Sequence, residues 1–118
     1  MSLQPQRTAD YLRHMIQAME RIQHYTQAMT LEAFLTEPLV QDAVIRNLEV
    51  LGEASHNIEK RDPAFAAAHP ELPLAFAYQM RNALAHGYFK VDLEIVWRTV
   101  QRDLPRLLAQ VQGMVGQV

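Results

Sequence analysis

One eight-residue stretch concentrates the side chains of this chain that are best suited to chemistry. The run Arg81-Asn82-Ala83-Leu84-Ala85-His86-Gly87-Tyr88 carries a guanidinium, an amide, an imidazole and a phenol. Asn82 and His86 are four residues apart, so on a helix they share a face and Asn82 can orient the imidazole. Gly87 is expected to end this helix, which puts His86 where the helix dipole favours its protonated form. A protonated imidazole beside a permanent cation suits an anionic phosphate group.

The same residues also fit a structural role. Arg81 and His86 are five residues apart, about 140° around a straight α-helix, so they face the same way only where the helix ends. A helix terminus with a histidine in its last turn, a salt-bridged arginine and a packed Tyr88 would account for all of them. Spacing alone leaves both interpretations open.

Length and composition limit the classes of protein. The 118 residues predict a single domain, 1–118, with a core over about 8–112. The chain has no cysteine, which excludes disulfides, thiolate zinc sites and a cysteine nucleophile. A net charge of −2 argues against a protein that binds polyanions through bulk charge. No apolar run is long enough to span a membrane and no secretory segment is seen at the start, so a cytoplasmic protein is expected.

Helical periodicity recurs along the chain, and hairpin dipeptides are missing, so the sequence predicts an all-α fold. Four amphipathic helices with short connections predict an antiparallel, up-down four-helix bundle with a short extra helix in a connector. The long helices are expected at about 8–29, from Pro38 to about 58, at 73–86, and from a cap at Asp92 to about 112, with short helical turns at 30–35 and 62–68.

Several local features follow from residue type. Thr8 is expected to cap the first helix, and Gly52 to mark a close approach between helices. Pro105 is expected to kink the last helix, and the tail after Gln112 to be frayed. The methionines along the first helix stripe are expected to fill the core rather than to bind a cofactor: Met15, Met19 and Met29.

The chain resembles the HepT toxins of the HEPN superfamily over about residues 8–110. The string R-x-x-x-x-H-x-Y at 81–88 is similar to the signature of that family. Gly52-Glu53-Ala54 in the second helix, Asp10-Tyr11-Leu12 in the first and Val91-Asp92-Leu93-Glu94-Ile95-Val96-Trp97 in the last also fit, in the same order. One departure is the apolar run after Pro73, where the family usually has a tryptophan and a more polar face.

The resemblance implies a metal-independent endoribonuclease that works as a homodimer with a shared cleft and needs no cofactor. RNA carries its own nucleophile, the 2′-OH, so the protein supplies proton transfer and a cation. His86 would be general acid or base, Arg81 would stabilise the developing negative charge, and Asn82 would orient His86 or contact phosphate. The expected product ends in a 2′,3′-cyclic phosphate.

The resemblance also implies a partner. In that family a minimal nucleotidyltransferase antitoxin (MntA-like) transfers AMP to the tyrosine that corresponds to Tyr88, in a type VII-like toxin–antitoxin pair. A bulky anionic nucleotide two residues from His86 would fill the phosphate site and repel RNA.

Other charged side chains have two interpretations each. Three arginines recur every four residues near the end of the chain: Arg98, Arg102 and Arg106. They form either a stripe that binds RNA weakly or, more simply, a solvent-exposed helix face. Arg46 either forms a salt bridge to Glu49, Glu53 or a neighbouring helix, or supports the motif. Glu53 is expected to hold Arg81 or Asn82.

The remaining ionisable side chains suggest no further site. Glu53-x-x-His56 matches half of a di-iron ligand set, but no second such pair exists, so no metal site is expected. His14, His24 and His69 are expected at the surface.

Two other functions remain open. A non-catalytic helical dimer that docks onto a nucleotidyltransferase would share the fold. A bundle that binds a small molecule would need a ligand-sized apolar pocket, which sequence neither predicts nor excludes.

Overall fold

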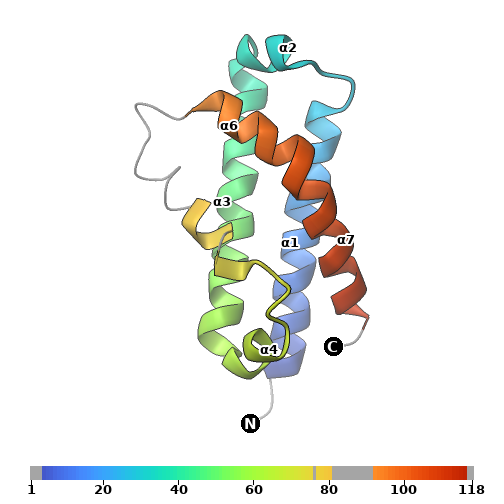
Figure 1. The fold of residues 1–118 in the computed structure, drawn as a ribbon, viewed down its shortest axis with the longest axis vertical. Helices are drawn as coiled ribbons and strands as arrows, with labels where there is room; N and C mark the ends of the chain where they lie inside the picture. Colours follow the sequence, from blue (N-terminus) through green and yellow to red (C-terminus); the bar gives the residue numbers. More distant parts are fainter. Residues whose placement is uncertain (1–3, 76, 81–91, 117–118) are drawn as a thin grey trace.

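The computed structural model describes residues 4–75, 77–80 and 92–116, and every regular element in these ranges is a helix (Figure 1). This confirms the predicted all-α class. Residues 74–75 and 77–80 are helical, as expected for the start of the third long helix. The elements are α1 (Gln4–Thr26), α2 (Leu31–Leu35), α3 (Pro38–Arg61), α4 (Pro63–Ala68), α6 (Leu93–Arg98), the π-helical turn η1 (Thr99–Asp103) and α7 (Leu104–Val115).

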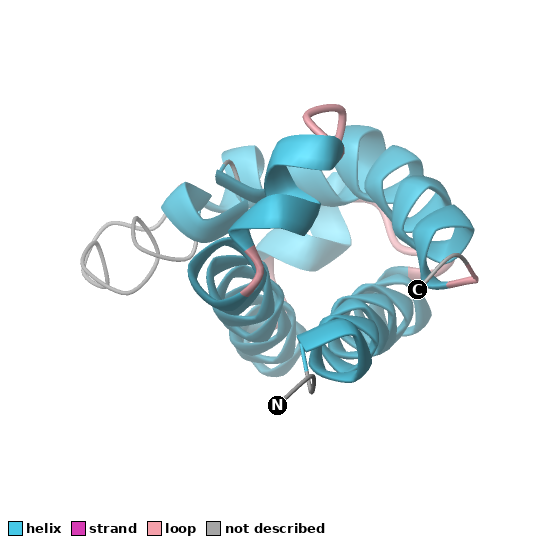
Figure 2. Cartoon of the chain, turned by 90° about the horizontal axis from the view of Figure 1, so that it is seen from below, coloured by secondary structure: helices cyan, strands magenta, loops and turns pink. Residues whose placement is uncertain are grey.

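The long helices α1 and α3 pack against each other as an antiparallel pair, and α7 packs against α1 (Figures 1 and 2). At the end where α1 leads into α3, the short α2 contacts both α3 and α6. The apolar stripes that the sequence predicts meet in one core. Its most completely buried members, none more than 1% exposed, are Leu12, Met15, Ala18, Met19, Ile22, Phe34, Val44, Leu48, Ile58, Val96, Leu104 and Val111.

The predicted N-cap of the first helix is wrong. Thr8 lies one turn inside α1, which begins at Gln4, and its side chain is buried. The hydroxyl of Thr8 donates to Oδ2 of Asp62 at 2.6 Å, while Oδ1 of the same carboxylate accepts from the Phe65 amide at 3.2 Å and caps α4. A partner 54 residues away therefore replaces the local cap, and Asp62 joins α1, α3 and α4.

The first helix also ends earlier than predicted. Thr26 is its last residue, and its hydroxyl donates to the Ile22 carbonyl at 2.8 Å. Ala28 follows with a φ of 63°, the left-handed conformation in which helices commonly stop. Met29, expected on the helix stripe, lies beyond the helix and packs against the core from there; Met15 and Met19 are fully buried core residues, as predicted.

The last helix changes its geometry one turn before Pro105. The Leu104 amide bonds to the Thr99 carbonyl, five residues back, and Pro105 has no N–H with which to continue an α-helical pattern. The helix changes direction here (Figure 1), so the predicted disruption takes the form of a π-turn. The predicted fraying after Gln112 is wrong, because α7 continues to Val115, whose side chain packs against the core together with Met114.

Among the residues that the structure describes, no helix combines the length and the apolarity needed to cross a bilayer.

Candidate functional site

The four residues that the sequence places in the motif, Arg81, Asn82, His86 and Tyr88, lie outside the described ranges. The structure describes the segments that precede and follow them in the chain. Segment 73–80 leads directly into Arg81, and α6 begins shortly after the motif at Leu93. The predicted helix boundary at Gly87 also lies outside the described ranges.

Segment 73–80 is anchored to the bundle by its apolar side chains and by an aromatic stack. Leu74 and Ala77 are each 3% exposed and belong to the core. The ring of Tyr78 stacks on the ring of His56 in α3, with centroids 4.0 Å apart and planes 12° apart. Because Tyr78 is three residues before Arg81 in the chain, this stack fixes the described segment that precedes the motif.

The same stack gives His56 a role other than metal binding. The sequence places Glu53 and His56 at the spacing of a di-iron half-site, but His56 lies face to face with Tyr78. Within the described part of the chain, no three histidine or carboxylate side chains gather in a way that could hold a metal ion.

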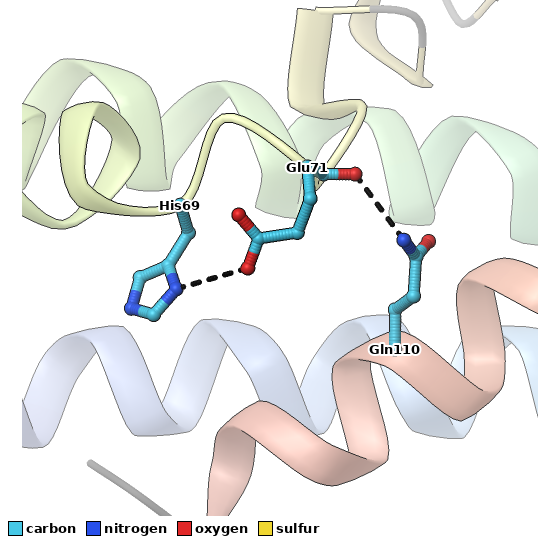
Figure 3. A network of polar contacts seen from close by, with 3 residues as sticks. All are labelled: His69, Glu71 and Gln110. Atoms are coloured by element: carbon cyan, nitrogen blue, oxygen red, sulfur yellow. Dashed lines mark hydrogen bonds and ion pairs between the residues drawn. The ribbon is translucent and has the colours of Figure 1, made fainter.

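The loop before segment 73–80 is fastened to α7 by a polar network (Figure 3). The side-chain amide of Gln110 donates to the Glu71 carbonyl at 3.2 Å, and the Glu71 carboxylate lies 3.2 Å from Nδ1 of His69. A backbone hydrogen bond and then the bond with His69 lower the pKa of the Glu71 carboxyl. His69, expected as a plain surface residue, is half-buried and lies against the ring of Phe65 at 4.5 Å. His14 and His24 are exposed, as predicted.

A polar hollow of about 410 Å³ lies between α1 and α3, and Arg46 and Glu53 both line it. The salt bridge expected from Arg46 to Glu49 or Glu53 is not formed, although the structure describes all three side chains. The partners expected for Glu53, which are Arg81 and Asn82, lie outside the described ranges.

Arg98 and Arg102 share a second hollow, of about 380 Å³, with Met80 and Ile95. Both arginines are exposed, and neither forms an ion pair with a carboxylate of the described residues. Met80 immediately precedes Arg81 in the chain. Arg98 and Arg102 therefore line one hollow together with the last described residue before the motif.

The sequence did not reveal a third, mostly apolar hollow of about 340 Å³. It lies between α3, segment 73–80 and the η1–α7 helix, where Leu48, Leu51, Ala77 and Leu107 are among its walls. Each of these residues fits the pattern of an ordinary core position. Since the hollow forms only where three elements distant in sequence meet, no spacing along the chain could have predicted it.

The protein is thus an all-α bundle in which two arginines, Arg98 and Arg102, share a hollow with Met80, the residue that precedes the histidine-containing motif. Comparison with known families identifies the class more closely. The model of the HepT-like family, described as "Ribonuclease HepT-like", matches residues 15–114. This range covers most of the chain and includes all four motif residues. The chain belongs to the HepT-like family, as the resemblance of its motifs predicted.

Curated relatives agree with this assignment. The chain is 43% identical over 105 residues to a protein of Thermococcus cleftensis named "Probable ribonuclease HepT", covering 89% of this chain and 93% of the relative. It is 33% identical over 105 residues to a "Putative RNase" of Caldanaerobacter subterraneus subsp. tengcongensis, covering 89% and 91% of the two chains. A Methanocaldococcus jannaschii protein named as a gamma-glutamylcyclotransferase and putative RNase is 36% identical, covering 86% of this chain and 44% of its own length. No solved structure matches the chain significantly.

Proposed function

We propose that this protein is a metal-independent endoribonuclease toxin whose chemistry is carried by Arg81 and His86. The observation that carries the proposal is the match to the HepT-like ribonuclease family across residues 15–114, a range that contains the complete R-x-x-x-x-H-x-Y string. The anchoring of segment 73–80 by the His56–Tyr78 stack supports it, because a catalytic group needs a rigid base.

The chemistry follows from RNA carrying its own nucleophile. His86 takes the proton from the 2′-OH, which attacks the adjacent phosphorus, and the bond to the 5′-oxygen breaks as that oxygen receives a proton. Arg81 stabilises the negative charge that develops on the phosphorane. In a homodimer with a shared cleft, one His86 acts as base and the other as acid. Asn82 orients His86, and Glu53 and Arg46 support the motif from α3. The products carry a 2′,3′-cyclic phosphate and a 5′-OH.

Tyr88 is the proposed control point of this activity. A nucleotidyltransferase antitoxin would transfer AMP to its hydroxyl, joining the phenolic oxygen to the α-phosphorus of ATP and releasing pyrophosphate. The added phosphate and nucleoside then occupy the space that the RNA backbone needs two residues from His86. Such a toxin–antitoxin pair would act in the cytoplasm, where its RNA substrates are.

The test is RNA cleavage by the purified protein in EDTA, with the intact mass measured on the same sample. Wild type is expected to cleave and to leave 2′,3′-cyclic phosphate ends. His86→Ala is expected to lose about 10²-fold or more in rate, the usual contribution of a general acid or base. His24→Ala is the matched control, because His24 is exposed on α1 and should leave the rate unchanged.

The other outcomes are equally informative. A wild-type sample without activity, but heavier by one or more AMP groups, would indicate a toxin silenced at Tyr88, and removal of AMP should then restore cleavage. An inactive sample of unmodified mass, folded and tested on several classes of RNA, would overturn the enzyme in favour of a module that docks onto a nucleotidyltransferase. Cleavage that stops in EDTA would refute metal independence.

A further inference from the structure

We infer that the two hollows on either side of Met80 form one subsite for a nucleotide that flanks the scissile bond, with its phosphate on Arg98 and Arg102 and its base in the apolar hollow. The inference rests on the proposed ribonuclease function and extends it to substrate specificity. The hollows of about 340 and 380 Å³ share three lining residues, Met80, Thr99 and Asp103. They are therefore neighbours across a common wall.

The two arginines that line the hollow of about 380 Å³ fit a phosphate. Arg98 and Arg102 stand four residues apart on one helix and line the same hollow. Like charges at this spacing cost a helix a few tenths of a kcal/mol, and no described carboxylate forms an ion pair with either arginine. Arg106 borders the adjoining hollow. The linings of the two neighbouring hollows together include three arginines and one carboxylate, Asp103, in a chain of net charge −2, and guanidinium forks suit phosphate oxygens.

The apolar hollow fits a base better than a second phosphate. Side chains of α3, segment 73–80 and α7 give it apolar walls, and its volume falls within the range of about 300–1,000 Å³ typical of small-ligand sites. The carboxylate of Asp103, which lines both hollows, would accept hydrogen bonds from the ring and exocyclic N–H groups of a base. A ligand with a phosphate at one end and N–H donors at the other matches both hollows.

The polar groups at the rim also suggest which base is preferred. The Gln110 amide nitrogen is already bonded to the Glu71 carbonyl, as Figure 3 shows, and the Thr99 hydroxyl donates to the Ile95 carbonyl at 2.9 Å. Asp103 is exposed and forms no ion pair with any described residue, so its two oxygens are acceptors for a ligand. Guanine alone among the four bases presents two adjacent donors, N1–H and the N2 amino group. We therefore expect a preference for guanine at this position.

The local helix geometry supports a functional site here. Thr99 and Asp103 begin and end the π-turn η1, and Arg102 lies within it. Turns of this kind inside α-helices occur frequently at functional sites. The π-turn belongs to the wall that both hollows share.

The test is direct binding, measured by fluorescence anisotropy with 2′-O-methyl oligonucleotides, which lack the nucleophile and are not cleaved. One probe alternates guanosine with uridine and the other alternates adenosine with uridine. Wild type should bind the guanosine probe about tenfold more tightly, since a bidentate contact to a base discriminates by roughly 5- to 150-fold. Asp103→Asn should abolish the preference.

Replacement of both arginines isolates the interaction with phosphate. The double variant Arg98→Gln/Arg102→Gln should weaken binding of both probes about tenfold. It should also reduce the slope of log K against log salt by about 0.7, since each neutralised phosphate adds about 0.7 to that slope and the two arginines hold one phosphate. The matched control is Arg21→Gln/Arg61→Gln, which removes the same charge from exposed positions on α1 and α3. Equal effects of both double variants would refute the subsite and leave only an effect of net charge.

A substitution that fills the apolar hollow tests separately whether the base binds there. Ala77→Leu adds bulk to the apolar wall without changing the charge, and it should lower affinity for both probes about tenfold. Ala77 is buried, so the thermal midpoint is measured alongside. If this variant does not fold, the substitutions at the exposed Asp103, Arg98 and Arg102 still decide the question.

Failure of this inference and failure of the proposed function are distinguishable. Wild-type cleavage that the Arg98/Arg102 variant retains in full, with unchanged probe binding, would overturn the subsite and leave the ribonuclease standing. Probe binding that the variant loses, without cleavage by a wild-type sample of unmodified mass, would keep the subsite and overturn the enzyme. Absence of binding to both probes by a wild-type sample of unmodified mass would overturn the subsite. Binding of polyglutamate instead of RNA, abolished in the variant, would assign the hollows to an acidic protein segment and also overturn it.

Discussion

Asp62 holds three helices together, and its replacement by alanine should be among the most damaging changes outside the core. One carboxylate oxygen accepts from the buried Thr8 hydroxyl at 2.6 Å and the other accepts from the Phe65 amide at the start of α4. Loss of an N-cap costs about 1 kcal/mol. A buried hydroxyl left without its acceptor costs about 1–2 kcal/mol more. The free energy of unfolding should therefore fall by about 2–3 kcal/mol.

Chemical denaturation at fixed protein concentration measures this change, because self-association would otherwise alter the apparent stability. For a domain of this length, about 2.5 kcal/mol corresponds to a melting temperature lower by about 10 °C. Asp62→Asn is the conservative control. Its side-chain oxygen can still cap α4 while its amide donates to Thr8, so the expected loss is below about 1 kcal/mol.

A double-mutant cycle with Thr8→Val separates the two interactions of Asp62. In the Thr8→Val background the orphaned hydroxyl no longer exists, so Asp62→Ala should cost only the cap, about 1 kcal/mol. The coupling energy should thus be about 1–2 kcal/mol. If Asp62→Ala costs the same in both backgrounds, the contact between α1 and Asp62 has no energetic weight and the reasoning is wrong.

Three further predictions concern the ends and supports of the helices. Ala28→Gly should raise the free energy of unfolding by roughly 0.5–1 kcal/mol, since glycine relieves the left-handed strain but loses more entropy on folding; a decrease in denaturation experiments would contradict this. His56→Ala should lower the rate of RNA cleavage while the protein stays folded. His56→Phe should restore most of the rate, because its ring can stack on Tyr78 again. Equal rates in both variants would show that the stack does not position the motif. The pKa of the Glu71 carboxyl is lowered from its ordinary value of 4.5 by a backbone hydrogen bond and then by the bond with His69, so its contribution to stability is present above that value and disappears as the pH falls below it. A melting series against pH should show a smaller loss of stability in acid for Glu71→Gln than for wild type, and equal losses would refute this contribution of the Glu71 carboxylate.

Burial made the long helices predictable from sequence. The apolar side chains of α1 and α3 recur with the helical period because each faces the same core, and Leu12, Met19, Val44 and Ile58 are all fully buried. Such a pattern fixes the type of an element and which of its faces is buried. It says little about where the element stops.

Helix ends were less predictable because distant contacts decide them. Thr8 has the right side chain for a cap, but its hydroxyl bonds to Asp62 instead. Gly113 does not stop α7, because Val111 is buried and Met114 packs against the core on the same helix. Tertiary packing overrides a local preference of about 1 kcal/mol in each case.

The candidate site divides in a similar way. The segment from Arg81 to Tyr88 stays a prediction from residue types, spacing and family resemblance, because it lies outside the described ranges. Of the two interpretations of Arg46, the salt bridge to Glu49 or Glu53 is not formed, since spacing along a helix permits an exposed ion pair but gives it little energy. The apolar hollow beside Met80 depends on how three elements meet, which no local pattern encodes.

The π-turn between α6 and α7 sets the rotational phase of the last helix. Through it, one continuous helix contacts α2 with its first part and α1 with its last part. The π-turn holds one residue more than the α-helical turn it replaces, so deletion of a single residue between 99 and 103 would allow an uninterrupted α-helix and leave Leu104, Leu107 and Val111 facing the core. Insertion of a residue beyond the turn would instead rotate the rest of α7 by about 100° about its axis and take these side chains out of the core. A deletion within this turn should therefore be far less harmful than an insertion after it.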